Sequence, residues 1–358
     1  MKKLLFAAYS LDVGGIEKAL VTLLNELQKK EYEITLVLEQ KEGIFLKELN
    51  PKIQVVTYTP NNDTNILKRK IINLLQQIKF SLKYKNKFDF SASFATYSNS
   101  GAFVSRTASQ NSYLWGHADY LTLHEDDKEK TKDFFRQKKY NKFKKIIFVS
   151  NEGKESFISL FPEMKEKTIV CNNLIDNKKI EELANEKIEL EKDEIITFLN
   201  VGRHDERQKR LSKLVEVAAK LKQEQYKFKI LFVGDGQDTE KYKKMVQEKD
   251  LQEYIIFLGR KQNPYPYFKI SDCVILTSDY EGYPVVFLES MILNKPIITT
   301  KVSDYEEIEG KYGYTTTKEI EDIYDKMKQF IENGFQIKEK FDADKYNKEI
   351  IKNIENLF

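Results

Sequence analysis

The sequence predicts an α/β protein made of two doubly wound, Rossmann-like domains that face each other across a cleft. Short apolar runs alternate with amphipathic helical segments along the chain, as in parallel sheets covered on both faces. The 358 residues correspond to about two domains of average size. Apolar residues make up 41% and charged residues 32%, which suffices for two cores and excludes collagen-like and disordered chains.

The first half contributes seven expected strands and two clear helices. Residues 16–27 show apolar residues at a helical period, and residues 66–84 are helical and basic. The expected strands are 3–9, 33–39, 53–58, 88–94, 112–114, 145–150 and 168–171.

The second half repeats this alternation. Its expected strands are 195–201, 228–233, 255–258, 273–277 and 296–299, and its expected helices are 210–222, 239–248, 285–293, 317–332 and 343–357. The polar stretch 176–193 is the predicted boundary region. We therefore expect a first domain over 1–172, a second over 173–342 and a C-terminal helix over 343–358. Ligands of such sheets bind beyond the carboxyl ends of the strands.

The strongest motif is a pair of glutamates, Glu281 and Glu289. Glu281 lies in the loop after the strand at 273–277, and Glu289 lies in the next helix with apolar residues on both sides. A buried carboxylate without a local cation needs hydrogen-bond donors. We therefore predict that Glu289 is buried and accepts from the two hydroxyls of a ribose, rather than facing solvent.

The start of that helix is a predicted anion site. Pro284 suits the first helical turn, where its missing N–H costs nothing, and the N–H groups of Val285 and Val286 are then free donors. The positive end of a helix favours an anion, commonly phosphate.

A second motif follows the strand at 195–201. Gly202 and Arg203 end the strand, and Lys209 and Arg210 lie where the next helix begins. Arginine can bind a diphosphate through paired hydrogen bonds and lysine as a point charge. Together they would neutralise charge on a leaving group. Alone the segment also fits a solvated basic turn; the acidic motif favours the diphosphate clamp.

Two weaker signals lie in the first half. Gly14 and Gly15 separate a strand from a helix, where glycine lets a ligand approach the backbone, although a tight turn without a ligand fits equally well. His117 follows the strand at 112–114, between Gly116 and Asp119. We predict that it hydrogen-bonds a sugar hydroxyl or a backbone carbonyl, against the alternative of a structural histidine.

Neither a cofactor nor a metal is expected. Residues 234–236 read Gly-Asp-Gly, but Thr239 replaces the third glycine of a dinucleotide fingerprint. Asp342 and Asp344 follow no strand, so they predict a helix cap rather than a metal site. The acidic run 125–127 is read as a solvated turn.

With these residues in hand, the sequence resembles the retaining glycosyltransferases of family 4, which have the GT-B architecture. Within that family it is most similar to bacterial enzymes of capsule and exopolysaccharide assembly. Glu281 and Glu289 carry the specific part of the resemblance; segments 14–17, 173–176 and 202–209 are also similar. The resemblance implies an acceptor-side first domain, a nucleotide-sugar-binding second domain and a last helix that crosses back to the first.

The resemblance also implies a role for each matching residue. Glu281 would hold hydroxyls of the donor sugar and Glu289 the ribose of the nucleotide. Arg203 and Lys209 would bind the diphosphate. The loop with Gly14 and Gly15 would also contact the diphosphate, as would the backbone at Tyr283, Pro284 and Val285. His117 would lie beside the donor sugar. The backbone around Arg260 would contact the base.

Three departures from the family pattern affect these roles. The spacing from Arg203 to its lysine is one residue longer, so Lys209 and Arg210 compete for the diphosphate. Asn294 replaces a common glycine after the motif helix, but asparagine tolerates the same left-handed backbone. Residues 302–306 stand where many relatives have a glycine pair, which leaves that wall of the sugar pocket undefined.

The predicted reaction is transfer of a hexosyl group from a nucleotide diphosphate sugar, a UDP-sugar, to a hydroxyl of a saccharide that is lipid-linked. The family retains the anomeric configuration, and the sequence shows no obvious protein nucleophile. This suggests that the acceptor hydroxyl attacks the anomeric carbon from the same face from which the leaving group departs. Two alternatives are a nucleotide-sugar 2-epimerase of the same architecture and a catalytically inactive nucleotide-sugar-binding subunit. The retained Arg203, Lys209, Glu281 and Glu289 argue against the second alternative.

The first half is the basic one. Residues 1–170 hold 28 basic and 20 acidic residues, whereas residues 171–358 hold 31 and 36. The stretches 66–84 and 128–145 mix basic and apolar residues, as helices on anionic membranes do, although a solvated face fits equally well. We expect salt-sensitive peripheral membrane contact and no nucleic-acid partner. No transmembrane run, signal peptide or disulfide pattern is found, so a cytoplasmic location, at the inner face of the membrane, is expected.

Overall fold

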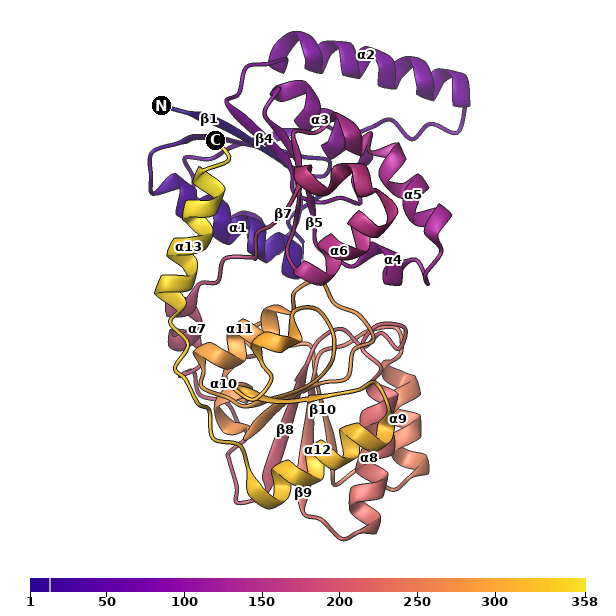
Figure 1. The fold of residues 1–358 in the computed structure, drawn as a ribbon, viewed down its shortest axis with the longest axis vertical. Helices are drawn as coiled ribbons and strands as arrows, with labels where there is room; N and C mark the ends of the chain where they lie inside the picture. The colour runs from indigo at the N-terminus through magenta and orange to yellow at the C-terminus, as the bar shows by residue number, and fades with distance from the viewer. Residues whose placement is uncertain (13) are drawn as a thin grey trace. The chain divides into compact units, whose positions relative to one another are not determined.

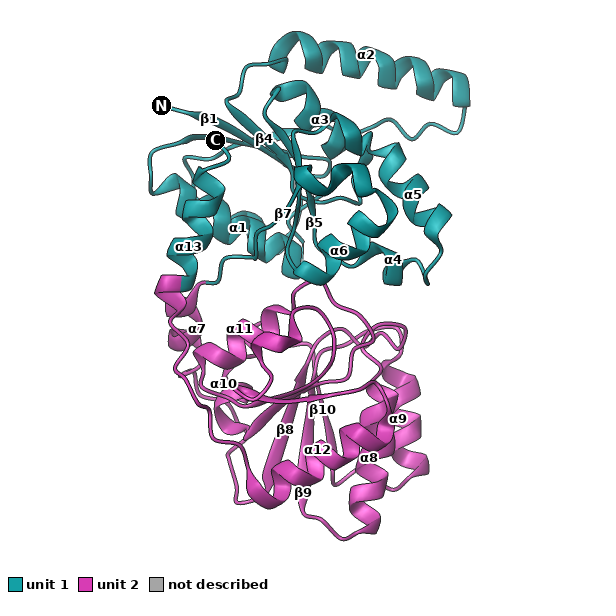
Figure 2. Ribbon diagram, viewed as in Figure 1, with its two compact units in different colours: residues 1–175, 346–358 teal, residues 176–345 magenta. Residues whose placement is uncertain are grey.

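The computed structural model describes residues 1–12 and 14–358, which divide into two compact units (Figure 2). The first unit contains Met1–Ile175 and Tyr346–Phe358, and the second contains Asp176–Lys345. Each unit is a parallel sheet covered by helices (Figure 1), which confirms the predicted α/β class. The unit boundaries lie three residues from those expected at 172 and 342.

The first unit has a seven-stranded parallel sheet in the order β3-β2-β1-β4-β5-β6-β7. Its strands are β1 (Lys3–Ala8), β2 (Glu33–Leu38), β3 (Gln54–Thr57), β4 (Phe90–Ser93), β5 (Ser112–Gly116), β6 (Lys145–Phe148) and β7 (Thr168–Val170). The order reverses between β1 and β4, so this edge is the topological switch point at which doubly wound sheets bind ligands.

The second unit has a six-stranded parallel sheet in the order β10-β9-β8-β11-β12-β13. Its strands are β8 (Ile196–Val201), β9 (Phe228–Val233), β10 (Ile255–Gly259), β11 (Cys273–Leu276), β12 (Ile297–Thr300) and β13 (Gly313–Thr316). The switch point lies between β8 and β11. Strand β13 was not predicted, because its sequence Gly-Tyr-Thr-Thr lacks the apolar run of the others.

Helices cover both sheets. Those of the first unit are α1 (Gly15–Gln28), α2 (Ile66–Tyr84), α3 (Asn99–Ala108), α4 (Tyr120–Leu123), α5 (Lys128–Gln137) and α6 (Asn151–Leu160). Those of the second are α7 (Asn177–Leu183), α8 (Leu211–Gln223), α9 (Thr239–Glu248), α10 (Tyr265–Ile270), α11 (Val285–Ile292) and α12 (Ile320–Asn333). The last helix is α13 (Ala343–Glu355), and short 3-10 turns are Ile44–Glu48, Tyr140–Lys142, Pro162–Lys167 and Tyr305–Glu307.

The predicted apolar stripe of α8 forms the core of the second unit. Leu211, Leu214, Val215, Ala218 and Leu221 are all fully buried. They pack against strand residues such as Phe198 and Ile230. Full burial of each large aliphatic side chain contributes about 1.5–3 kcal/mol, so this stripe fixes α8 on the sheet.

Helix α7 lies within the predicted boundary stretch 176–193, which begins where the second unit begins. Asp176 caps this helix by accepting from the N–H of Lys179 at 3.1 Å. Ile180 is buried on the inner side of this helix. Only Ile180 and Ala184 are buried in this polar stretch, too few to predict a helix from the sequence.

The last helix packs on the first unit. The carbonyl oxygen of Leu357 accepts from the Tyr113 hydroxyl at 3.0 Å, and the ring of Phe358 lies 4.7 Å from that of Phe90. Glu355 pairs with Lys30 at 2.7 Å. Asp342 caps the helix through the N–H of Lys345, at 2.9 Å, as predicted from the sequence. Among the described residues, the search for a helix able to cross a membrane found none.

A buried lysine after α5 leads to a prediction about stability. Lys138 is 2% exposed, and its ammonium lies 4.2 Å from the centre of the Phe134 ring. Burial lowers the pKa of Lys138 to about 8. The unfolded chain binds this proton up to about pH 10.4, so the cost of burying the charge is fully present below about pH 8 and disappears as the pH rises between these values.

We expect Lys138→Met to raise the free energy of unfolding at pH 7 by about 1–2 kcal/mol, since the cation–π contact offsets part of the burial cost. The gain should shrink toward zero near pH 10. Urea unfolding of the wild type and the Lys138→Met variant at pH 7 and pH 10 measures this difference in the free energy of unfolding. A gain that is the same at both pH values would contradict this origin.

Candidate functional site

Two loops meet at the switch point of the second unit. One follows β8 and runs from Gly202 to Arg210; the other follows β11 and runs from Thr277 to Pro284. They are tied together, because the N–H of Asp279 donates to the carbonyl of Gln208 at 2.8 Å and the hydroxyl of Thr277 donates to the carbonyl of Lys209 at 3.0 Å. The two strongest sequence motifs therefore form one site.

Glu281 is the buried centre of this site. Its side chain is 8% exposed, and its Oε1 lies 2.5 Å from the ammonium of Lys209, which is itself 18% exposed. The hydroxyl of Ser278 donates to the same oxygen at 2.7 Å, and Gln208 Nε2 approaches Oε2 at 3.3 Å. Three donors thus converge on this carboxylate, whose oxygens can each accept a further hydrogen bond.

Lys209 and Arg210, which compete for the diphosphate in the sequence, contact different carboxylates in the structure. Arg210 has φ +50° just before α8, and its guanidinium binds Asp279. Lys213 pairs with the same carboxylate at 2.8 Å. Although burial opposes it, these two cations lower the pKa of Asp279. Arg210 is therefore engaged in a structural ion pair, and Lys209 is the cation that lies against Glu281.

Arg203 is exposed at the end of β8, on a backbone that is firmly held. The N–H of His204 donates to the carbonyl of Asp235 at 3.0 Å, and the carbonyl of His204 accepts from Asp238 at 3.2 Å. A side chain at Gly236 would place a Cβ 2.3 Å from the carbonyl oxygen of His204, so only glycine fits there. The loop after β9 thus fixes the start of the Arg203 loop, a contact that the sequence did not indicate.

Glu289 is 6% exposed, which confirms its predicted burial. The hydroxyl of Tyr265, from α10, donates to its Oε1 at 3.0 Å. Tyr265 was missed by the sequence analysis, because nothing in the spacing between α10 and α11 shows that the two helices are neighbours.

The amino end of α11 lies beside these glutamates in the chain. Pro284 is the residue just before the helix, with φ −65° and ψ 114°, one position earlier than predicted. The helix begins at Val285, and no acceptor among the described residues is recorded for the N–H groups of Val285 and Val286. Tyr283 is buried and donates through its hydroxyl to Glu307 at 2.6 Å. The helix end is thus free to bind an anion.

The departures noted in the sequence have structural counterparts. Asn294 adopts the left-handed conformation, φ +54°, after α11, as predicted for a residue that replaces glycine. Ser303 is also left-handed, at φ +55°, and its hydroxyl donates to the carbonyl of Gly282 at 2.5 Å. The segment after β12 is therefore fixed against the Glu281 loop. Arg260 lies exposed after β10, two strands away from β8, with no recorded contact to the other predicted residues.

In the first unit, Gly14 and Gly15 open α1 at the carboxyl end of β1. Gly14 is extended, with φ −176°, and a Cβ there would lie 2.1 Å from a carboxylate oxygen of Glu17. Glu17 also accepts from the hydroxyl of Tyr97, which follows β4, at 2.9 Å. This hydrogen bond connects the segment after β1 to the segment after β4, next to the glycine pair in the chain.

His117 lies after β5 and is 9% exposed. Its ring is 4.6 Å from that of Phe94. Burial lowers the pKa of the imidazole to about 3, although a backbone contact with Phe94 acts in the opposite direction. Neither ring nitrogen makes a hydrogen bond of normal geometry to a described residue, and the indole N–H of Trp115 is likewise unpaired. The neutral imidazole therefore has a donor and an acceptor available for a ligand.

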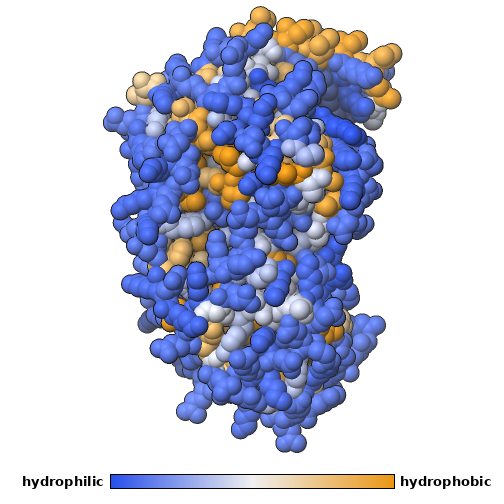
Figure 3. Space-filling model, viewed as in Figure 1, coloured by the Kyte–Doolittle hydropathy of each residue, from blue (hydrophilic) through white to orange (hydrophobic). Residues whose placement is uncertain are grey.

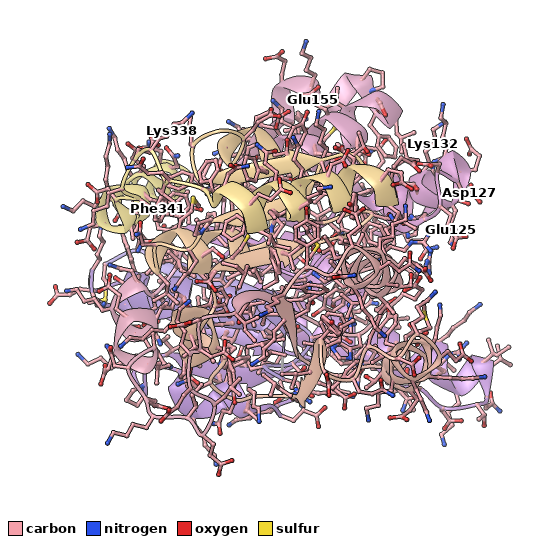
Figure 4. The ribbon with its side chains drawn as sticks, turned by 90° about the horizontal axis from the view of Figure 1, so that it is seen from below. Glu125, Asp127, Lys132, Glu155, Lys338 and Phe341 are labelled. Carbon is pink, nitrogen blue, oxygen red and sulfur yellow. The ribbon has the colours of Figure 1, made fainter. Side chains whose placement is uncertain are left out.

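Two features of the described residues bear on this site: they form no metal-ligand cluster, and a cavity lies elsewhere in the second unit. No group of three or more histidine, cysteine, aspartate or glutamate side chains is placed to hold a metal ion. A cavity of about 750 Å³ in the second unit is lined mainly by residues 337–344, including Lys338 and Phe341, which Figure 4 labels. It contains none of the predicted site residues.

Comparison with known proteins identifies the family. A family model described as "Glycosyl transferases group 1" matches residues 180–356. An uncharacterised glycosyltransferase of Methanocaldococcus jannaschii is 31% identical over 46% of this chain and 41% of its own length. A capsular polysaccharide biosynthesis glycosyltransferase of Staphylococcus aureus, CapH, is 30% identical over 49% of this chain and 48% of its own.

A relative that matches over more of the chain is the N-acetylgalactosamine-N,N'-diacetylbacillosaminyl-diphospho-undecaprenol 4-alpha-N-acetylgalactosaminyltransferase of Campylobacter jejuni. It is 26% identical over 84% of this chain and 81% of its own length. Among solved structures, Anabaena HepE in complex with UDP has a TM-score of 0.77 at 18% identity, covering 99% of this chain and 100% of its own. Staphylococcus aureus TarM has a TM-score of 0.75 at 15% identity, covering 100% and 99%.

At these identities the solved structures establish the fold, and the family model covers residues 180–356, just under half of the chain. The two parallel sheets match those of GT-B glycosyltransferases over the whole chain. The chain therefore has the GT-B fold, and its residues 180–356 match the glycosyl transferases group 1 family.

Proposed function

We propose that this protein transfers a hexosyl group from a UDP-sugar to a hydroxyl of a saccharide acceptor, with retention of the anomeric configuration. One observation carries the proposal: the buried pair Lys209 and Glu281 lies at the β8/β11 switch point, in the same loops as exposed Arg203 and the free amino end of α11. The solved structure of Anabaena HepE, which has the same fold, is a complex with UDP, and this supports UDP as the nucleotide.

The proposed donor contacts follow from the chemistry of each group. Glu281, whose carboxylate already accepts from three donors, holds hydroxyls of the sugar. Glu289, buried on α11, accepts from the ribose hydroxyls. Arg203, Lys209 and the N–H groups of Val285 and Val286 bind the diphosphate. The ammonium of Lys209 has three donors, so it can bridge Glu281 and a phosphate oxygen at the same time.

Catalysis in this proposal is electrostatic stabilisation of the leaving UDP. Negative charge builds on the diphosphate as the glycosidic bond breaks, and fixed positive groups there lower the barrier. Glu281 is committed to Lys209 and Ser278, which disfavours it as a nucleophile and favours attack from the leaving-group face. The departing phosphate oxygen takes the acceptor proton. Neutral His117 hydrogen-bonds the donor sugar without adding charge. No metal or cofactor takes part.

The proposed acceptor is a lipid-linked saccharide in capsule or exopolysaccharide assembly. The names of the relatives from Campylobacter jejuni and Staphylococcus aureus support this class, since one refers to a diphospho-undecaprenol acceptor and the other to a capsular polysaccharide. Peripheral contact of the basic first unit with the inner face of the cell membrane is part of the proposal.

Thermal shifts with UDP, UDP-glucose and UDP-N-acetylglucosamine test the nucleotide site. A ligand at about 100 times its Kd adds about 2.7 kcal/mol, which should raise Tm by roughly 5–10 °C. UMP, which lacks the second phosphate, is the control and should shift Tm less. Absence of a shift with every UDP compound would refute the proposal.

Incubation with the bound UDP-sugar alone then separates the reaction classes. We expect slow hydrolysis to UDP and free sugar, because water replaces the missing acceptor. Formation of an epimeric UDP-sugar would instead indicate a 2-epimerase, and binding without any turnover, even with acceptor saccharides, would indicate an inactive subunit.

A further inference from the structure

Helix α2 exposes an unusual aliphatic surface. Six of its side chains, here called the outer stripe, are between 48% and 79% exposed. They are Leu67, Ile71, Leu74, Leu75, Ile78 and Leu82. Their spacing of three, four and seven residues places them on one side of the helix. Figure 3 shows this side as an orange strip at the periphery of the first unit.

The orientation of α2 is fixed by its opposite side. Phe80 is 6% exposed, and its ring lies 5.2 Å from that of Tyr58 and 6.1 Å from that of Phe103. Asn73, seven residues before Phe80, exchanges hydrogen bonds with the backbone of Asn61 at 2.7 and 3.1 Å. The helix therefore has a well-packed inner face, and its outer stripe cannot be buried by a small rotation.

The charge of α2 is entirely positive. The helix has five basic residues and no aspartate or glutamate. One of them, Lys68, pairs with Asp63 at 2.7 Å, and Lys83 lies 5.0 Å from the centre of the Tyr84 ring. Lys70 and Lys79 are exposed, and no ion pair with another described residue is recorded for either.

The second basic stretch, 128–145, has no comparable surface. Phe135 and Phe143 are buried in the core, and Lys138 is buried beside them. The helical part, α5, neutralises its cations locally, for instance Lys132 with Glu129 at 3.0 Å. Figure 4 shows Asp127 and Lys132 together at the surface of this region, which is polar.

We propose that α2 lies in the headgroup plane of an anionic membrane, with its outer stripe inserted to the level of the acyl chains. An anionic bilayer offers what α2 presents, an apolar layer under negative charge. The α2 helix of a second copy would cover the stripe but would bring its own five cations against these, and α2 itself has no acidic residue to pair with them. The biological purpose rests on the proposed lipid-linked acceptor, whereas membrane binding itself does not.

The test is flotation of the full chain with vesicles of phosphatidylcholine alone or with roughly 30% phosphatidylglycerol, at about 50 and about 500 mM salt. The wild type should bind the anionic vesicles more strongly. The triple variant Ile71→Gln, Leu74→Gln, Ile78→Gln should lose about tenfold or more of binding at both salt concentrations. Glutamine keeps helix propensity, and all three positions point away from the core.

Two matched triple variants separate charge from insertion. Lys70→Gln, Lys79→Gln, Lys83→Gln should lose binding at low salt only, because its apolar contact is intact. Lys128→Gln, Lys130→Gln, Lys132→Gln, on α5, should bind like the wild type. Wild-type binding by the outer-stripe variant, loss in the α5 variant, or no wild-type binding at low salt would each overturn the proposal.

Insertion depth and self-association have their own readouts. In Leu74→Trp, quenching by lipids brominated on the acyl chains should exceed that of the wild type, whose single Trp115 is 1% exposed. Light scattering should show the same mass for the wild type and the outer-stripe variant; a change from dimer to monomer would mean that a second copy occupies the stripe. The UDP thermal shift, measured in parallel, should persist in every α2 variant, and its absence in the wild type would refute the proposed function alone.

Discussion

Replacing Arg203 by alanine is expected to reduce kcat at least 100-fold while leaving Tm unchanged. Arg203 is exposed, and its backbone is held through His204 and Asp235 rather than through its own side chain, so the fold does not depend on the guanidinium. A 100-fold loss corresponds to about 2.7 kcal/mol of transition-state stabilisation, the size expected for one fixed charge on a developing diphosphate. The donor KM should change less than kcat, because the charge grows as the bond breaks.

Steady-state kinetics with a saturating acceptor, together with thermal unfolding, measures this effect. Arg136→Ala is the matched control, since Arg136 is exposed on α5 in surface ion pairs with Asp133 and Glu129 and lies outside the site. An Arg203→Ala enzyme with unchanged kcat would remove Arg203 from the catalytic machinery.

Lys209 should behave differently from Arg203, because it also neutralises a buried carboxylate. Lys209→Met leaves Glu281 without its cation and should cost about 2 kcal/mol of stability in addition to activity. Adding Glu281→Gln should restore much of that stability but no activity. The pair of variants therefore separates the structural role of Lys209 from its proposed contact with the diphosphate.

Helices and strands were predictable where their buried positions form a periodic or continuous apolar pattern in the sequence. The stripe of α8 and the runs of β9 and β11 are apolar because both faces of each sheet are covered. Helices α3 and α6 were missed because small and polar residues fill them, and their starts depend on Ser98 and Ser150 as caps. Strand β13 was missed because backbone pairing with β12, rather than an apolar sequence, defines it.

The candidate site was predictable in its motifs but not in its contacts. Two glutamates after one strand and two cations after another indicate a common sheet edge once the strands are known to be parallel. The choice between Lys209 and Arg210 depends on a left-handed residue that turns adjacent side chains toward different carboxylates. Tyr265 belongs to a separate helix, and no local pattern connects it to Glu289.

The same limit applies to the surface of the first unit. Composition alone shows two stretches that mix lysine with apolar residues, 66–84 and 128–145. Only tertiary packing decides that the phenylalanines of the second face the core, whereas the leucines and isoleucines of α2 face outward. A hydrophobic period identifies an amphipathic helix, but it does not say which partner covers the apolar side.

Replacing Glu289 by alanine is expected to weaken UDP binding by about 10–100-fold, the cost of losing charge-assisted hydrogen bonds to two ribose hydroxyls. Calorimetry measures the affinity of the wild type and of the Glu289→Ala variant for UDP and for its 2′,3′-dideoxy analogue. The four affinities form a thermodynamic cycle. The wild type should bind the analogue much more weakly than UDP, because the buried carboxylate then lacks the two ribose donors. The variant should bind both ligands alike, since the partner of the hydroxyls is already absent.

Tyr265→Phe provides the control for orientation. It removes a hydroxyl that donates to Glu289 while keeping the carboxylate, so UDP affinity should fall only a few-fold and the preference for UDP over the analogue should persist. If the losses from Glu289→Ala and from the dideoxy analogue instead add independently, the carboxylate does not hold the ribose, and its burial must serve the packing of α10 against α11.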